Sequence, residues 1–386
     1  MWYLSQLGRR EHYALPAYLH AQGKLRMLAT DVWAPWAQLV PSMLCPHKLS
    51  QRFSPEMAGA HVVSPSLAAG ILGRFRRETS YARWVREGKK FGSFAARQFA
   101  RNGLGAGDAV LGYTAANLEQ LRCARKNNAR GLHVQVDPGV SWYRVRESEQ
   151  IMHPYAEPSS TMPSGEFLDR IAEEWDSADV VIVHSKHSME CLIDQGVPAS
   201  KCRIIPPAFK PKGNSLVRTF NPSKSFKVLF VGNHCLAKGF HVFAEAAKLA
   251  GSGFEFRSAG SEALFKNYRA EVTRYVTILG RLPHAHVLAE MSQADVLVFP
   301  TLSDGFGLVQ LEAMAMGLPV VSTSSCGEVV RNGIDGYVIP ERDPLAIVHA
   351  IELLKDPERH RTFSGAALLR SADFSPERQA IALMNL

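Results

Sequence analysis

The feature that most constrains the fold is a regular alternation of short apolar runs with amphipathic segments, which is clearest after residue 227. The apolar runs read as buried strands and the segments between them as helices. Strands are predicted at 227–232, 254–258, 276–279, 296–300, 319–322 and 336–339, and helices at 239–250, 284–292, 307–316 and 344–354. Because right-handed crossovers join strands that alternate with helices, we expect a parallel sheet.

The first half of the chain shows the same alternation less regularly. Strands are predicted at 2–5, 25–30, 61–64, 109–113, 132–136, 180–184 and 202–206. A segment rich in proline, lysine and serine at 206–225 is the best linker candidate. We therefore predict an α/β protein of two doubly wound Rossmann-like domains, 1–208 and 209–386, whose last helix is able to pack back on the first domain. Ligands of such sheets bind beyond the carboxyl ends of the strands, so a binding cleft between the domains is expected.

Composition excludes several classes of protein. A hydrophobic content of 46% excludes a disordered chain, and no pair among the six cysteines has the CxxC spacing of a zinc ribbon or redox site. Neither a signal peptide nor a run of eighteen apolar residues is visible, so we expect a cytoplasmic protein whose membrane contact, if any, is peripheral. The net charge of +8 leaves nucleic acid, an anionic membrane and an acidic substrate open as partners.

The strongest motif is the segment 300–319, in which a strand ends at Pro300 and a glycine-containing loop leads into a helix. Two glycines at a helix start allow a phosphate to approach free backbone amides. Asp304 lies in the loop, and Glu312 lies eight residues later on an apolar helix stripe. A carboxylate there needs hydrogen-bond donors, which the hydroxyls of a ribose would supply. The alternative is an ordinary strand–loop–helix with Glu312 facing solvent.

A second loop, at 230–239, repeats the strand–glycine–helix pattern and carries Lys238 just before the helix. A lysine at a helix start is a suitable diphosphate ligand, because its point charge adds to the helix dipole. Surface lysines at helix starts are common, so this motif is weak alone. Two such loops on neighbouring strands of one sheet predict a single anion site.

These motifs together resemble the retaining nucleotide-sugar glycosyltransferases of family four, which have the two-domain GT-B fold and belong to the glycosyl transferases group 1. The acidic–x7–acidic motif of that family matches Asp304 to Glu312, and Gly280-Arg-Leu-Pro-His284 is similar to the segment that precedes it. The segments 178–185, 196–198 and 204–206 look like the end of the family's acceptor domain. The resemblance covers nearly all of 170–355 and the rest more loosely.

The resemblance implies a role for particular residues. Glu312 would bind the donor ribose, Asp304 the transferred sugar, and Lys238 with the loop amides the diphosphate. Leu282 would lie near the base. The donor-binding set also includes Gly8, Gly232, Asn233, Gly305, Phe306, Gly307 and Leu308. No metal and no cofactor are expected, because Lys238 and the helix amides would neutralise the leaving diphosphate.

Three positions depart from the family's pattern. Asp304 stands where Glu is usual, and Asn233 stands where an Arg would add a cation to the phosphate site. Asp137 replaces a histidine that often follows the strand at 132–136; it would act in catalysis by orienting the acceptor or contacting the sugar. The alternative for Asp137 is a turn aspartate before Pro138-Gly139.

The excess of positive charge is concentrated in 71–100, which holds eight basic and two acidic residues, interleaved with Trp84, Phe91 and Phe94. Such a pattern suits an interfacial helix on an anionic membrane, and the family's acceptors are often lipid-linked. The alternative is a partly buried helix with solvated arginines. Three glycines in the segment, Gly73, Gly88 and Gly92, weaken the prediction of one long helix.

The function implied is a hexosyl-type, metal-independent glycosyltransferase of the kind used in polysaccharide biosynthesis. It would move a sugar from a nucleotide diphosphate sugar to the hydroxyl of a glycan or lipid-linked saccharide, with retention of configuration. The domains would close around the linker at 206–225. Two alternatives stay open: a catalytically weak binding or scaffold protein with the same fold, favoured by Asn233 and Asp304, and a nucleic-acid-binding protein. No nucleic-acid module is recognisable, so nucleic acid is not an expected partner.

Overall fold

The computed structural model describes residues 1–38, 49, 51–65, 81–159, 162–211 and 215–386. The amino-terminal half contains a parallel sheet in the order β3-β2-β1-β4-β5-β6-β7. Its strands are β1 (Trp2–Gln6), β2 (Leu25–Thr30), β3 (Val62–Val63), β4 (Ala109–Tyr113), β5 (Arg130–Val134), β6 (Val180–Val183) and β7 (Cys202–Ile204). Every strand predicted in this half is confirmed, with small differences at the ends.

The carboxyl-terminal half contains a second parallel sheet in the order β10-β9-β8-β11-β12-β13. Its strands are β8 (Phe226–Val231), β9 (Phe254–Ala259), β10 (Val276–Ile278), β11 (Val296–Phe299), β12 (Val320–Ser322) and β13 (Gly336–Val338). In both sheets the sequence order reverses beside the first strand, which is the doubly wound arrangement predicted for two Rossmann-like domains.

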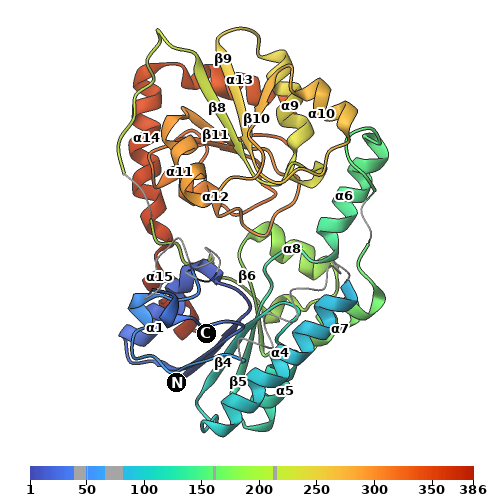
Figure 1. The fold of residues 1–386 in the computed structure, drawn as a ribbon, viewed down its shortest axis with the longest axis vertical. Coiled ribbons are helices and arrows are strands. Elements are labelled where there is room, and N and C mark those ends of the chain that lie inside the picture. Colours follow the sequence, from blue (N-terminus) through green and yellow to red (C-terminus); the bar gives the residue numbers. More distant parts are fainter. Residues whose placement is uncertain (39–48, 50, 66–80, 160–161, 212–214) are drawn as a thin grey trace.

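Helices cover both faces of each sheet (Figure 1). In the amino-terminal half they are α1 (Ala14–Ala21), α4 (Tyr81–Arg101), α5 (Leu118–Lys126), α6 (Val140–Met152), α7 (Gly165–Ser177) and α8 (Lys186–Asp194), with 3-10 turns η1 (Arg10–Tyr13), η2 (Pro35–Gln38), η3 (Pro55–Met57) and η4 (Ala199–Lys201). In the other half they are α9 (Phe240–Leu249), α10 (Lys266–Val272), α11 (His284–Gln293), α12 (Val309–Met314), α13 (Pro344–Leu354), α14 (Pro357–Ser371) and α15 (Pro376–Met384), with η5 (Leu236–Lys238) and η6 (Ala372–Phe374).

Burial of both sheet faces explains why the strands are almost uniformly apolar. Every residue of β6 and of β11 is buried, so these strands show no alternation of polar and apolar positions. Helix α12 begins later than the predicted start at 307, because Gly307 has φ of +80° and therefore cannot belong to a right-handed helix.

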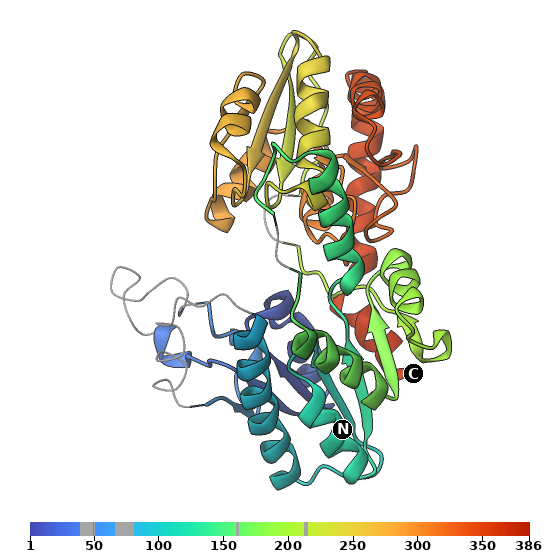
Figure 2. The same cartoon turned by 90° about the vertical axis from the view of Figure 1, so that its right-hand side faces the viewer.

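The two halves are tied together at places other than the linker. Helix α14 runs toward the first domain, and α15 packs there against α1, with Ala380 and Leu383 in the core that contains Leu15 and Leu19 (Figure 1). Helix α6 leaves the first domain and extends beside the second (Figure 2), where the backbone N–H of Phe265 donates to the carbonyl of Ala156 at 3.0 Å. The domains therefore meet along several segments of the chain.

Helix α4 contains the described part of the basic aromatic segment; residues 71–80, including Gly73, lie outside the described residues. Phe91 and Phe99 are buried on the sheet, whereas Trp84 is 60% exposed. Gly88 and Gly92 do not interrupt the helix, which is continuous over Tyr81–Arg101. A Cβ at Gly88 would lie 1.9 Å from the carbonyl oxygen of Ala115, so this glycine allows α4 to pack closely on the backbone that follows β4. The expectation that these two glycines weaken the helix is wrong.

None of the helices in the described part of the chain is long and apolar enough to cross a bilayer.

Candidate functional site

A pocket of about 440 Å³ opens between the two domains at the carboxyl ends of both sheets. Its carboxyl-terminal wall contains eight of the residues predicted to bind a donor: Gly232, Asn233, Lys238, Asp304, Phe306, Gly307, Leu308 and Glu312. Its amino-terminal wall includes Arg10, Glu11, Tyr113 and His184. The cleft predicted from two facing sheets is therefore present, and most of the predicted residues line one cavity.

Lys238 and Asp304 contact each other directly within this pocket. The ammonium group of Lys238, at the end of η5, pairs with Oδ2 of Asp304, which follows β11. The side chains are 17% and 19% exposed, so the ion pair is largely shielded from water. The other carboxylate oxygen of Asp304 accepts the backbone N–H of Phe306 at 3.4 Å. Two residues that were predicted to contact different parts of a donor thus form an ion pair with each other.

Glu312 is also paired inside the pocket. It lies in the first turn of α12, and its Oε1 is 3.0 Å from Nε2 of His284, at the start of α11. Its side chain is 22% exposed, which excludes the alternative of a freely solvated helix residue. His284 belongs to the motif quoted in the sequence, but its contact with Glu312 depends on the packing of α11 against α12 and is not visible in the spacing.

The two glycines of the 304–307 loop have different roles. Gly307 adopts φ of +80°, a left-handed conformation that turns the chain into α12. At Gly305 an added Cβ would lie 1.9 Å from the carbonyl oxygen of Val136, which belongs to the other domain. Its own carbonyl accepts the hydroxyl of Ser188 at 3.2 Å. Gly305 therefore contacts the amino-terminal domain instead of lining the pocket, which differs from its predicted role.

The amino-terminal wall contains a cation that the sequence analysis missed. Arg10 lines the pocket, and its guanidinium lies over the ring of Tyr113, 5.4 Å from the centroid. Lys238 was expected to carry most of the positive charge of the site, but Arg10 adds a second cation from the opposite domain. Its position two residues after Gly8, in the turn that follows β1, was the available signal.

The loop that carries Arg10 is conformationally strained. The next three residues, Glu11, His12 and Tyr13, have φ of 47°, 55° and 64°, a left-handed conformation that costs energy in any residue with a side chain. Glu11 accepts the backbone N–H of Ala208 at 3.2 Å, and burial raises the pKa of its carboxyl to about 7. Strain of this kind is often found where a loop must direct side chains into a binding site.

His184 follows β6 and completes the same wall. Its Nδ1 lies 2.9 Å from the carbonyl oxygen of Ile205, which assigns the proton to that nitrogen. Burial lowers the pKa of His184 to about 4, so the imidazole is neutral at physiological pH. Its Nε2 then carries an acceptor lone pair in the neutral ring.

Three further predicted residues lie outside this pocket, and Asn233 has another partner within it. Asp137 lines a separate cavity, and its Oδ1 accepts the N–H of Gly139 at 2.9 Å and the amide of Gln135 at 2.8 Å, the geometry of the turn alternative. Burial raises the pKa of Asp137. The N–H of Gly8 donates to Asp31 at 2.9 Å, so this amide is occupied. Leu282 is half-buried outside the pocket, whereas Asn233 lines it and accepts the Ser261 hydroxyl at 2.5 Å.

Comparison with known proteins agrees with this geometry. Residues 225–356, which hold most of the carboxyl-terminal wall, match the model of the family Glycosyl transferases group 1. An uncharacterized glycosyltransferase of Methanocaldococcus jannaschii is 31% identical over 157 residues, which are 39% of this chain and 44% of that protein. A D-inositol 3-phosphate glycosyltransferase of Paenarthrobacter aurescens is 29% identical over 218 residues, 53% of each chain. The chain spans about half the length of such relatives.

Solved structures share the fold along the whole chain. Sucrose-phosphate synthase of Thermosynechococcus elongatus superposes with a TM-score of 0.67 at 22% identity, covering 99% of this chain and 97% of that one. HepE of Anabaena, solved in complex with UDP, gives a TM-score of 0.62 at 15% identity, covering 100% and 98%. Two facing Rossmann-like domains in the GT-B arrangement are therefore confirmed. The segment 225–356 is thus similar to the glycosyl transferases group 1, and the whole chain shares its fold with solved GT-B structures.

Proposed function

We propose that the protein transfers a hexose-type sugar from a nucleoside diphosphate sugar to an acceptor hydroxyl, with retention of configuration at the anomeric carbon. One observation carries the proposal: a single interdomain pocket contains Lys238, Asp304 and Glu312 on one wall and Arg10 on the other. HepE of Anabaena, which shares the fold, has been solved with UDP and with UDP-glucose, which supports a nucleotide sugar as the donor.

Each polar group has a role in this proposal. On donor binding, Glu312 would break its contact with His284 and accept the ribose hydroxyls. Lys238 would break its ion pair with Asp304 and bind the diphosphate. Arg10, whose contact in the structure is with the Tyr113 ring, would supply a second cation from the opposite wall. Asp304, released from Lys238, would accept hydroxyl groups of the transferred sugar. Donor binding thus replaces two protein pairs by protein–ligand contacts of the same chemistry.

In the transfer step, the bond between the anomeric carbon and the diphosphate oxygen breaks and a bond to the acceptor oxygen forms on the same face. Lys238 and Arg10 would stabilise the negative charge that develops on the leaving diphosphate. The departing phosphate oxygen would take the proton of the acceptor hydroxyl, so no protein base is required. These cations would replace a metal ion at the diphosphate, and closure around the linker would exclude water.

The acceptor would bind in a second cavity of about 400 Å³, next to the first in the amino-terminal domain. Gly8, Arg10 and Tyr113 form its side toward the cleft, and Trp84 and Phe91 of α4 form the opposite side. An aromatic and basic lining suits a glycan or a lipid-linked saccharide. The exposed ring of Trp84 and the lysines of α4 would contact an anionic membrane, which co-sedimentation with anionic and neutral vesicles at low salt would test.

The donor assignment can be tested by thermal unfolding with UDP, GDP, ADP and their sugars. A true donor raises the melting temperature with the logarithm of its concentration, and the shift should disappear in Lys238→Ala and Glu312→Ala. The affinity for the nucleotide is expected to be equal in EDTA and in Mg²⁺. Unchanged donor binding in both variants would exclude this site. Binding without turnover, against a panel of glycan acceptors, would favour the scaffold alternative.

A further inference from the structure

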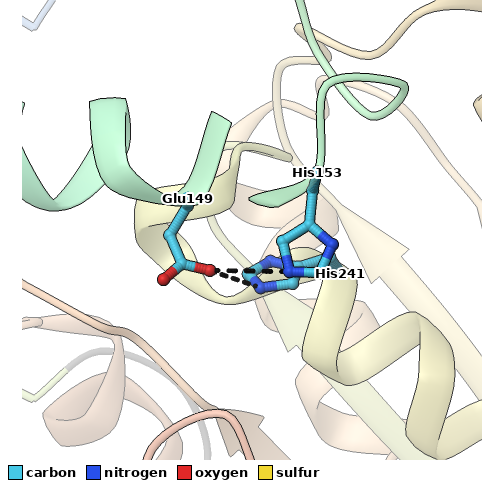
Figure 3. A group of neighbouring side chains, drawn as sticks. All are labelled: Glu149, His153 and His241. Carbon is cyan, nitrogen blue, oxygen red and sulfur yellow. Dashed lines mark ion pairs between the residues drawn. The ribbon is translucent and has the colours of Figure 1, made fainter. Parts of the chain in front are cut away.

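Three potential metal ligands meet where α6 of the first domain contacts α9 of the second, away from the pocket between the sheets. Glu149 lies on α6, His153 follows its last residue, and His241 lies in the first turn of α9 (Figure 3). One nitrogen or oxygen from each side chain lies within 4.8 Å of the other two. The sequence spacing does not reveal this group, because its third member comes from the other domain.

The donor atoms are close to the spacing of a tetrahedral site. His241 Nε2 is 3.0 Å and His153 Nε2 is 3.8 Å from Oε2 of Glu149. Ligands about 2.0–2.1 Å from a tetrahedral zinc ion are about 3.4 Å apart, so these two separations lie within about 0.4 Å of the tetrahedral value. The set of two imidazoles and one carboxylate leaves a fourth position free.

The cluster is buried and incompletely hydrogen-bonded. The Glu149 side chain is fully buried and that of His241 is 9% exposed. Within the described residues, neither ring nitrogen of His241 completes a hydrogen bond of normal geometry, and nor does Oε2 of Glu149. This holds although Nε2 of His241 lies only 3.0 Å from that oxygen. Buried polar atoms without a well-formed hydrogen bond are costly, and a cation bound among these atoms would remove the cost.

Other side chains hold two of the ligands in orientation. The Nδ1 of His153 lies 3.2 Å from the Tyr155 hydroxyl, which leaves Nε2 facing Glu149. Arg342 donates from Nε to Oε1 of Glu149 at 2.6 Å, which leaves Oε2 facing the histidines. Arg342 reaches this position from a left-handed conformation, φ 58°. Hydrogen-bond partners that orient the imidazole and the carboxylate in this way are typical of metal sites in proteins.

We propose that Glu149, His153 and His241 bind one divalent transition-metal ion of the zinc class. Imidazole and carboxylate donors in a site with an open position suit zinc, cobalt and nickel better than magnesium or calcium. His153 and His241 also line a surface pocket with Tyr155, Glu245 and Tyr268, and this pocket would be the route of entry. Because the ligands come from both domains, the bound ion joins α6 to α9, whose first residue follows Lys238 by two positions.

The test uses the full chain without a histidine tag, stripped of metal. Titration with Zn²⁺ against a chromogenic chelator, and with Co²⁺ followed by visible absorption, should give one site per chain and a tetrahedral cobalt spectrum. His153→Ala and His241→Ala should each weaken binding by at least about 100-fold. Tyr155→Phe should weaken it by about 10–100-fold, the range for a partner of a ligand.

His349→Ala is the matched control, because His349 is an exposed histidine of the same domain outside the cluster. It should leave the affinity and the cobalt spectrum unchanged. Circular dichroism and thermal unfolding of each variant separate lost binding from lost folding, and His153→Gln and His241→Gln replace any alanine variant that does not fold. Absence of a one-to-one site in the wild type, or equal binding by the histidine variants and the control, would show that these residues form an interdomain ion pair only.

Discussion

Lys238 and Asp304, from two neighbouring loops of the same sheet, form an ion pair in the middle of the interdomain pocket. The pair satisfies a cation and a carboxylate that are both largely buried, so neither charge is left uncompensated without a ligand. A diphosphate must therefore compete with Asp304 for Lys238. Variants of the two residues should consequently change nucleotide affinity in opposite directions.

Lys238→Ala is expected to weaken UDP binding by about 10–100-fold, because a charge-assisted contact is worth about 1.5–3 kcal/mol. Asp304→Asn should strengthen binding of the free nucleotide by up to about 10-fold, because it releases Lys238, while transfer falls. Isothermal titration with UDP measures both. Lys224→Ala, at an exposed lysine of the linker, should have no effect. Equal affinities of all three variants would contradict a diphosphate contact at Lys238.

Glu312→Gln is expected to weaken nucleotide binding by about 5–10-fold, because an amide binds ribose hydroxyls less strongly than a carboxylate. His284→Ala leaves Glu312 without its partner and should not weaken binding as much, since the ribose replaces the histidine. Comparing UDP with the uracil base alone localises the effect to the ribose. If Glu312→Gln lowered the affinity for UDP and the affinity for uracil by the same factor, this would argue against a ribose contact.

Glu157→Gln should destabilise the contact between the amino-terminal domain and the loop at 230–239. This fully buried carboxylate accepts the N–H of Leu236 at 3.1 Å and Nε of Arg146 at 2.7 Å, so it ties η5 and Lys238 to the amino-terminal domain. Loss of its charge is expected to cost about 1–3 kcal/mol, measured by urea unfolding. Glu166→Gln, at an exposed position of α7, is the control. Equal midpoints for the two variants would contradict the interpretation.

Glu11 makes stability depend on pH in a defined direction. Burial raises the pKa of its carboxyl from 4.5 to about 7, so the folded protein favours the protonated form. Its contribution to stability is present below pH 4.5 and is lost as the pH rises through about 7. Glu11→Gln cannot ionise, so it should be more stable than the wild type at pH 8 by about 1–2 kcal/mol and similar at pH 4.5. Chemical unfolding at both pH values checks this; a constant difference would contradict it.

Two helix glycines should respond oppositely to alanine. Gly88→Ala would place a Cβ 1.9 Å from the Ala115 carbonyl, so separation of α4 from its neighbour should cost about 2–4 kcal/mol. Gly365 in α14 has no atom within 4 Å of an added Cβ, so Gly365→Ala should stabilise by up to about 1 kcal/mol. Thermal unfolding of both proteins compares the effects. A Gly88→Ala protein as stable as the wild type would show that α4 does not depend on this close approach.

Local patterns predicted the fold well because buried parallel strands are short, apolar and separated by amphipathic helices. The strand at 180–184 could be recognised from four successive apolar residues, and the loops at 230–239 and 300–307 from glycine next to a helix start. The roles of Gly88, Gly92 and Gly305 could not be predicted, because what a glycine allows to approach depends on the segment opposite. For the same reason the sequence could not decide whether Asp137 acts in catalysis or stabilises the turn before Pro138-Gly139.

By itself the sequence determined that this chain forms two doubly wound domains and that Lys238, Asp304 and Glu312 lie at one edge of the second sheet. These properties follow from periodicity and from the position of residues relative to strand ends, which are local. Only the tertiary structure decided that those three residues are paired, that Arg10 and His184 face them, and that Glu149 and His153 meet His241. Such contacts join residues far apart in the chain, and they depend on how α6, α9 and the two sheets pack together, which no local pattern encodes.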